Sequence, residues 1–162
     1  MHSVRRIATV AVCIAALGGG TALASTCDWG HSGGHSGESQ YGETRGKQGC
    51  TPGFWKNHVS TWEGYSSSQK FNAVFGVSYK SSLTLGDALK LGGGGFAALA
   101  RHATAALLNA AHDDVDYGLT SSEIIALVKN AFATGNSEPL KNRLDSLNNA
   151  GCSIDAHGRP IR

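Results

Sequence analysis

Long apolar runs, alternating strand patterns and common catalytic motifs are scarce in this sequence of 162 residues. Its longest apolar run, residues 7–17, is too short for a membrane span of roughly 20 residues. No stretch alternates polar and apolar residues for long enough to require a strand, and residues 77–79 are the one weak candidate. Cys-x-x-Cys, His-Glu-x-x-His and phosphate-loop motifs are missing too. These absences disfavour motif-defined enzymes and leave open a catalytic pair assembled from distant residues.

The N-terminus has the layout of a secretory signal peptide. Arg5 and Arg6 precede the apolar run, and Ala22-Leu23-Ala24 has the small-x-small form that signal peptidases accept. We therefore expect residues 1–24 to be removed on export to the extracellular space or cell envelope. The residues before Cys27 match a lipid-attachment site poorly.

Without that segment the chain carries no charge excess. Arg5 and Arg6 account for the whole formal charge of +2, so twelve basic residues then balance twelve acidic ones. A balanced chain without a Lys/Arg cluster argues against nucleic acid or an anionic membrane as its partner.

Three cysteines remain after export, because Cys13 lies in the signal segment. We favour a disulfide between Cys50 and Cys152, because these residues bracket the whole patterned region. Cys27 is then free or joins another chain, for example in a disulfide-linked dimer. The alternative pairing is Cys27 with Cys50, which leaves Cys152 free.

The remaining chain divides into three parts. Residues 25–49 are rich in Gly and Ser and are predicted to be a flexible linker. Residues 50–153 have the apolar periodicity of a folded domain, and residues 154–162 are predicted to be a loose tail.

The periodicity of the patterned region is helical. We expect short helices after the capping-type residues 66–69 and at residues 85–91. The strongest pattern covers residues 96–111, and two further helices begin near Thr120 and Ser137, the first ending at Gly135. The predicted fold is a compact all-α domain of four or five helices, closed by the Cys50–Cys152 disulfide.

The most distinctive segment spans residues 50–58 and reads Cys-Thr-Pro-Gly-Phe-Trp-Lys-Asn-His. It resembles a Cys-Thr-Pro-Gly-aromatic-Trp-Lys-Asn-His motif at the head of a family of secreted bacterial domains. Segments 83–89, 105–112 and 147–152 are similar to the same family. The resemblance implies an extracellular location and carries over no catalytic residues.

Within this motif, Thr51-Pro52-Gly53 is predicted to form a turn that Trp55 anchors on the helical core. The residues that follow are either structural or the edge of a binding site, so the binding candidates are Trp55, Lys56, Asn57, His58 and His102. His102 lies with Asn109 along one edge of its helix, which we interpret as a solvated shoulder rather than a groove.

An acidic loop at residues 113–118 raises the question of a cation. It fails the EF-hand pattern, because apolar residues fall on ligand positions. A non-standard site for a divalent cation remains a candidate, with Asp113, Asp114, Asp116 and His112 as its ligands. The alternative is a structural role, in which His112 as a cation interacts favourably with the exposed carbonyls at the end of its helix and the acids cap the next helix.

Three functions follow in order of preference. The first is a secreted, non-catalytic domain for adhesion, matrix or envelope association, with an extracellular protein or polysaccharide as partner. The second is an extracellular metal-binding protein that uses the His and Asp residues above. The third is a small secreted hydrolase with His58 or His112 as the general base.

Overall fold

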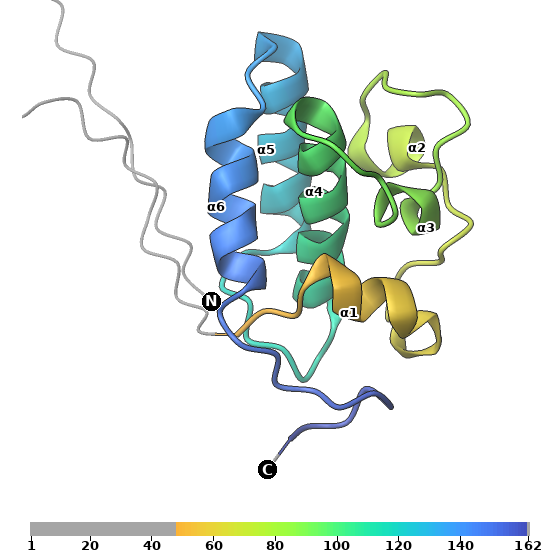
Figure 1. Ribbon diagram of the computed structural model, residues 1–162, viewed down its shortest axis with the longest axis vertical. Helices are drawn as coiled ribbons and strands as arrows, with labels where there is room; N and C mark the ends of the chain where they lie inside the picture. Colours follow the sequence, from red (N-terminus) through yellow and green to blue (C-terminus); the bar gives the residue numbers. More distant parts are fainter. Residues whose placement is uncertain (1–47, 162) are drawn as a thin grey trace, which may run out of the picture. The chain divides into compact units, whose positions relative to one another are not determined.

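The computed structural model describes residues 48–161, which fold into a helical domain closed by a Cys50–Cys152 disulfide (Figure 1). Its elements are α1 (Pro52–Asn57), the short 3₁₀ helix η1 (Val59–Thr61), α2 (Phe71–Phe75), α3 (Leu85–Ala88), α4 (Gly95–Ala111), α5 (Ser121–Thr134) and α6 (Glu138–Asn148). No strand occurs among the described residues, which contain isolated bridges only. The all-α class and the favoured disulfide are confirmed. The predicted signal peptide and Cys27 lie outside the described residues.

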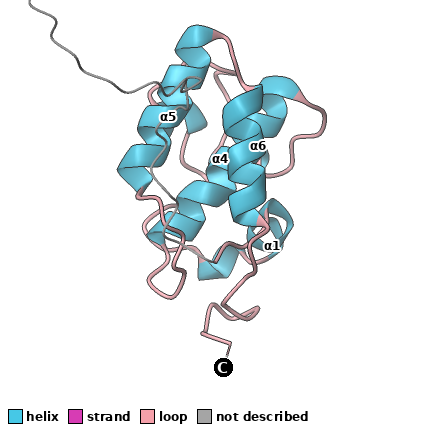
Figure 2. Ribbon diagram, turned by 90° about the vertical axis from the view of Figure 1, so that its left-hand side faces the viewer, coloured by secondary structure: helices cyan, strands magenta, loops and turns pink. Residues whose placement is uncertain are grey.

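Helix α4 is the centre of the domain. It lies beside α5 and α6, while α1 and α3 contact it from other sides (Figure 1, Figure 2). Its most extensive contact is with α6. The alanines of α4 permit this close packing on several sides, because they leave room for the neighbouring backbones. Leu99 and Leu107 of α4 are completely buried, as are Ile124 of α5 and Leu144 of α6.

Threonine side chains begin three of the helices. Thr51, Thr84 and Thr120 each accept the backbone N–H of the residue three positions later. At Thr120 the side chain of Glu123 also returns to the cap backbone, which completes a capping box. Gly135 ends α5 with a left-handed φ of 70°, a conformation that glycine adopts without strain.

The short helix predicted after residues 66–69 is α2, which begins after Lys70. Residues 66–69 themselves form a turn, in which Ser66 N–H donates to the side chain of Gln69. Pro52 and Gly53 start helix α1 rather than forming a free turn, since Thr51 caps them. Residues 77–79 form no strand.

The disulfide end of the domain extends beyond Cys50. Gly49 N–H donates to the carbonyl of Gly151 at 2.9 Å, and Gln48 N–H donates to the carbonyl of Asp116 at 3.2 Å. A Cβ at Gly49 would collide with the carbonyl of Leu147, so only glycine fits there. The last two residues of the predicted linker therefore belong to the folded domain.

The predicted loose tail is folded in its described part, which ends at Ile161. Ile154 is buried and forms a bridge with Pro160. Between them the carboxylate of Asp155 accepts the backbone N–H groups of Arg159 and His157 and pairs with the Arg159 guanidinium. These hydrogen bonds, those from Arg159 first, lower the pKa of Asp155 to about 2. Local polar contacts thus close a turn that a Gly-Arg-Pro sequence did not suggest.

Candidate functional site

The buried half of the Cys50–His58 motif is hydrogen-bonded to α4 through Cys50, Trp55 and Asn109, a network that we call the polar lock. Trp55 is completely buried, and its indole N–H donates to Oδ1 of Asn109 at 3.0 Å. The same oxygen accepts the backbone N–H of Cys50 at 2.8 Å, and Asn109 Nδ2 donates to the Cys50 carbonyl at 2.9 Å. Asn109 is itself completely buried, so these bonds form in a low-dielectric interior where an unpaired amide is costly. The predicted anchoring role of Trp55 is borne out by this geometry.

A second amide extends the lock to α6. Asn148 Oδ1 accepts from Asn109 Nδ2 at 3.0 Å and from the hydroxyl of Tyr117 at 2.8 Å. Asn148 Nδ2 donates to the carbonyl of His102 on α4 at 3.0 Å. Burial is the main cause that raises the pKa of Tyr117 far above its usual range, so its hydroxyl remains a donor. The disulfide, α4, α6 and the loop before α5 are therefore joined by one buried network.

The other half of the motif faces outward. Lys56 and Asn57 are exposed, and His58 is partly buried with its ring stacked 4.4 Å from that of Phe54. His58 Nδ1 donates to the carbonyl of Phe54 at 2.8 Å, which places a ring proton on that nitrogen. The ring therefore closes the end of α1. Trp55 points inward while Lys56 and Asn57 point outward, so the motif does not gather its candidates into one site.

His102 is buried, and the predicted solvated shoulder is wrong for both His102 and Asn109. The buried face of α4 is wider than the spacing of its leucines and alanines indicates, because α6 also covers the edge that carries His102 and Asn109. His102 Nδ1 has no hydrogen-bond partner among the described residues and lies 3.7 Å from Oδ1 of Asp145. Burial lowers the pKa of His102, and the Asp145 carboxylate opposes that shift. Burial therefore favours the uncharged form of His102 at the contact between α4 and α6.

His112 and the acidic loop do not form the predicted cation site. His112 is buried, its Nδ1 accepts the backbone N–H of Asp114 at 3.2 Å, and its Nε2 lies 3.7 Å from Oε1 of Glu63. The carboxylates of Asp113, Asp114 and Asp116 are exposed, while their backbones bond to other segments. Across residues 48–161 no three His, Cys, Asp or Glu side chains are placed to hold a metal ion. His112 does end α4, but its Nδ1 accepts a hydrogen bond, so its contacts are those of a neutral ring and not of a cation that balances the helix end.

One surface was missed by the sequence reasoning. Five aromatic rings from α2, the α2–α3 loop, α4 and α5 contact each other in series, at centroid distances from 4.5 to 6.4 Å: Phe71, Phe75, Tyr79, Phe96 and Phe132. The first two are buried, whereas the other three are partly exposed. The lysines near them, Lys70, Lys80 and Lys129, lie far apart in the sequence, so no run of charge marks the surface there.

No protein-family model matches the chain, and neither a curated protein nor a solved structure matches it. In the described part, none of the helices has the length and apolar content needed to cross a membrane.

Proposed function

We propose that this protein is a secreted, non-catalytic domain that associates with the extracellular matrix or the cell envelope. The observation that carries this proposal is the polar lock at the disulfide end. There the N-terminal segment joins the domain through Gln48 and Gly49, and the Cys50–Cys152 bond and Asn109 hold it in place. Because its N-terminal segment is held firmly, such a domain is suited to presentation at the end of the predicted linker, residues 25–49.

The contacts of the conspicuous polar residues support a binding rather than a catalytic role. His58 closes α1, His112 is held by Asp114, and Asn109 spends both amide groups on Cys50 and its neighbours. A general base needs a nitrogen lone pair within hydrogen-bond reach of the proton that it removes. His58 donates through Nδ1 and keeps a lone pair on Nε2, whereas the contacts of His112 and Asn109 are those of residues that stabilise the fold.

In this proposal the predicted linker, residues 25–49, attaches the domain to its partner through Cys27. Cys27 stands apart from the paired Cys50 and Cys152, so after export its thiol is available for a bond to a partner or to a second copy. Non-reducing electrophoresis of the exported full chain tests this step. We expect a dimer or a heavier adduct that collapses on reduction and is lost in Cys27→Ser. A monomer in both proteins would contradict attachment through Cys27.

A further inference from the structure

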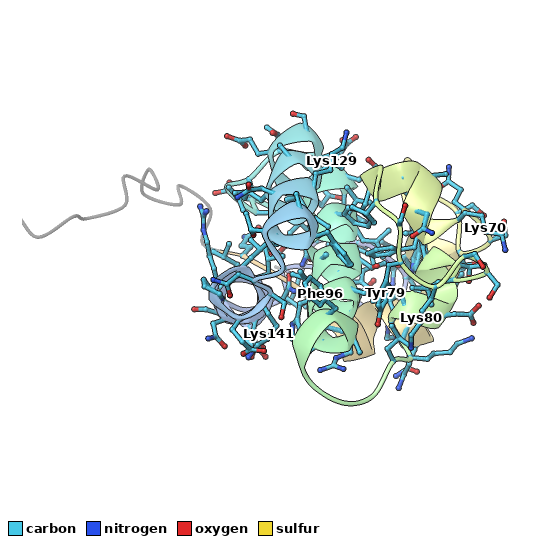
Figure 3. The ribbon with its side chains drawn as sticks, turned by 90° about the horizontal axis from the view of Figure 1, so that it is seen from above. Lys70, Tyr79, Lys80, Phe96, Lys129 and Lys141 are labelled. Atoms are coloured by element: carbon cyan, nitrogen blue, oxygen red, sulfur yellow. A yellow bond between two sulfur atoms is a disulfide. The ribbon has the colours of Figure 1, made fainter. Side chains whose placement is uncertain are left out.

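We propose that the domain binds an acidic polysaccharide through a lysine–aromatic surface made of Lys70, Lys80 and Lys129 with Tyr79, Phe96 and Phe132. This inference rests on the proposed function and names the partner class for it. Figure 3 looks onto this surface, where Phe96 and Tyr79 lie near the middle and Lys70, Lys80 and Lys129 lie around them. The surface combines partly exposed rings with exposed lysines.

The three aromatic side chains form one continuous platform. Phe132 of α5 lies 4.6 Å from Phe96 and 5.4 Å from Tyr79, measured between ring centroids. Asn72 fixes the position of Tyr79, because its side-chain oxygen accepts the Tyr79 backbone N–H at 3.0 Å. Rings held from several elements keep their faces in place without a ligand, so little entropy is lost when a partner binds.

The approach to this platform is open. Phe96 follows Gly92–Gly95, and a Cβ added at any of these four glycines would meet nothing within 4 Å. The bare backbone therefore lets a bulky polymer come close to the Phe96 ring, which a larger side chain would obstruct.

The lysines of the surface have no carboxylate within ion-pairing distance in the described chain. Lys70 Nζ donates to the carbonyl of Ser82, and Lys80 Nζ lies 5.5 Å from the centre of the Tyr79 ring. The end of the Lys129 side chain lies against Gly76, the C-cap of α2. Asp87 pairs with Lys90 and Glu138 with Lys141, and Asp87 also interacts with Lys70 over a longer distance. The three ammonium groups thus have no carboxylate in direct contact and can pair with an external anion.

Charge is separated along the domain although the mature chain is balanced overall. Six of the nine described acids lie after the C-terminal end of α4, in the first turn of α5, in the segment after η1 and in the tail: Glu63, Asp113, Asp114, Asp116, Glu123 and Asp155. Such a separation produces a positive potential over the lysine–aromatic surface that attracts an anionic partner and repels a cationic one.

A polysaccharide fits this surface better than a membrane or a nucleic acid. Sugar rings have apolar faces that pack on aromatic rings, while their carboxylate or sulfate groups pair with ammonium groups. The two exposed large aliphatic side chains of the described chain, Val59 and Ile161, lie elsewhere, so this surface has no aliphatic wedge for lipid. The three cations of this surface are lysines, which lack the planar guanidinium fork that pairs with phosphate through two parallel bonds.

Affinity electrophoresis of the exported full chain tests the proposal. Native gels contain alginate, dextran sulfate or neutral dextran, which separates a carboxylate from a sulfate preference. The variant is Lys70→Gln with Lys80→Gln and Lys129→Gln. The control, Lys56→Gln with Arg143→Gln and Arg159→Gln, removes the same charge from α1, from the part of α6 near Glu123 and from the tail. Phe96→Leu removes a ring and keeps an apolar side chain, and thermal melts verify folding.

We expect retardation by at least one acidic polysaccharide and not by dextran, and this retardation should weaken with added salt. The triple variant should lose about tenfold in affinity, Phe96→Leu several-fold, and the control much less. No retardation, equal loss in the variant and its control, or tighter binding to phosphatidylglycerol vesicles or oligo-dT would overturn the inference. A triple variant that stays in the washed matrix like the unaltered chain would also overturn it and leave the proposed function standing.

Discussion

Trp55 and Asn109, fifty-four positions apart, share a hydrogen bond of 3.0 Å with both side chains completely buried. The indole is not the only partner of this amide, because Asn109 also bonds to the backbone N–H and carbonyl of Cys50. The most conspicuous motif in the sequence is therefore explained by folding: it seals the N-terminal segment on α4 beside the disulfide. This explanation makes direct predictions for stability.

Replacing Asn109 by alanine should destabilise the domain strongly. The change leaves the Trp55 N–H and both Cys50 backbone groups buried without a partner, and each such group costs about 1–3 kcal/mol. We expect a loss of about 3–5 kcal/mol in the free energy of unfolding, measured by urea denaturation. Asn149→Ala, at an exposed position, is the matched control and should cost less than about 1 kcal/mol. Equal losses would contradict the lock.

Breaking the disulfide should cost about as much again. The bond spans 102 positions, and a loop of about 100 residues corresponds to about 4.7 kcal/mol in the chain-entropy model. We expect Cys152→Ser with Cys50→Ser to lower stability by about 3–5 kcal/mol in denaturant titrations. Cys27→Ser should leave the stability of the monomer unchanged. A domain that melts at the same temperature with and without reductant would refute this prediction.

The helical class was predictable from the apolar periodicity of the sequence and from its helix-capping residues. Thr84, Thr120 and Gly135 act as local signals, so their helices begin or end where the sequence predicts. Buried polar residues were not predictable in this way, because what covers them is tertiary. Asn109 and His102 look like a solvated edge until α6 and the Cys50 segment are placed against them. Ile154 likewise becomes core through contacts that its loop-like surroundings do not reveal.

Acidification should weaken the domain through His102. Burial lowers the pKa of His102 below 6.5 in the folded state, so the unfolded chain binds a proton more readily. Stability should be unaffected by this group above about pH 7 and should fall as the pH decreases below 6.5. Urea titrations between pH 7.5 and 5 should show a smaller slope in His102→Gln. Asp145→Asn should steepen the slope, since Asp145 raises the pKa of His102, whereas Arg101 and Lys141 lower it.

Identical slopes in His102→Gln and the unaltered chain would contradict this role. The carboxylates with lowered pKa values, Asp87, Glu123 and Asp155, are expected to contribute at lower pH. Their effect therefore falls outside the window that reports on His102.

Thr120→Ala should shorten or loosen α5. The threonine hydroxyl accepts Glu123 N–H, and the Glu123 carboxylate accepts Thr120 N–H at 2.8 Å. Losing this capping box should cost about 1 kcal/mol in unfolding experiments. Amide exchange in residues 121–124 should accelerate. Ser121→Ala keeps the box and serves as the control, so a comparable loss there would show that the cap is unimportant.

The lysine–aromatic surface could not be predicted from the sequence, because its residues come together only in the folded domain. Phe71 and Phe75 are buried in the core, and Phe132 is partly buried and packs against it. That Phe132 also meets Tyr79 and Phe96 at the surface depends on how α2, α4 and α5 pack. A balanced net charge likewise hides its separation in space.

Fractionation of cells that produce the tagged full chain tests the proposed role most directly. The chain is followed by electrophoresis in the cytosol, the culture medium and the washed envelope and matrix. We expect a processed chain, shortened by the N-terminal segment, that stays with the washed envelope or matrix. An unprocessed chain in the cytosol, or a processed chain found only free in the medium, would contradict a secreted domain for matrix or envelope association.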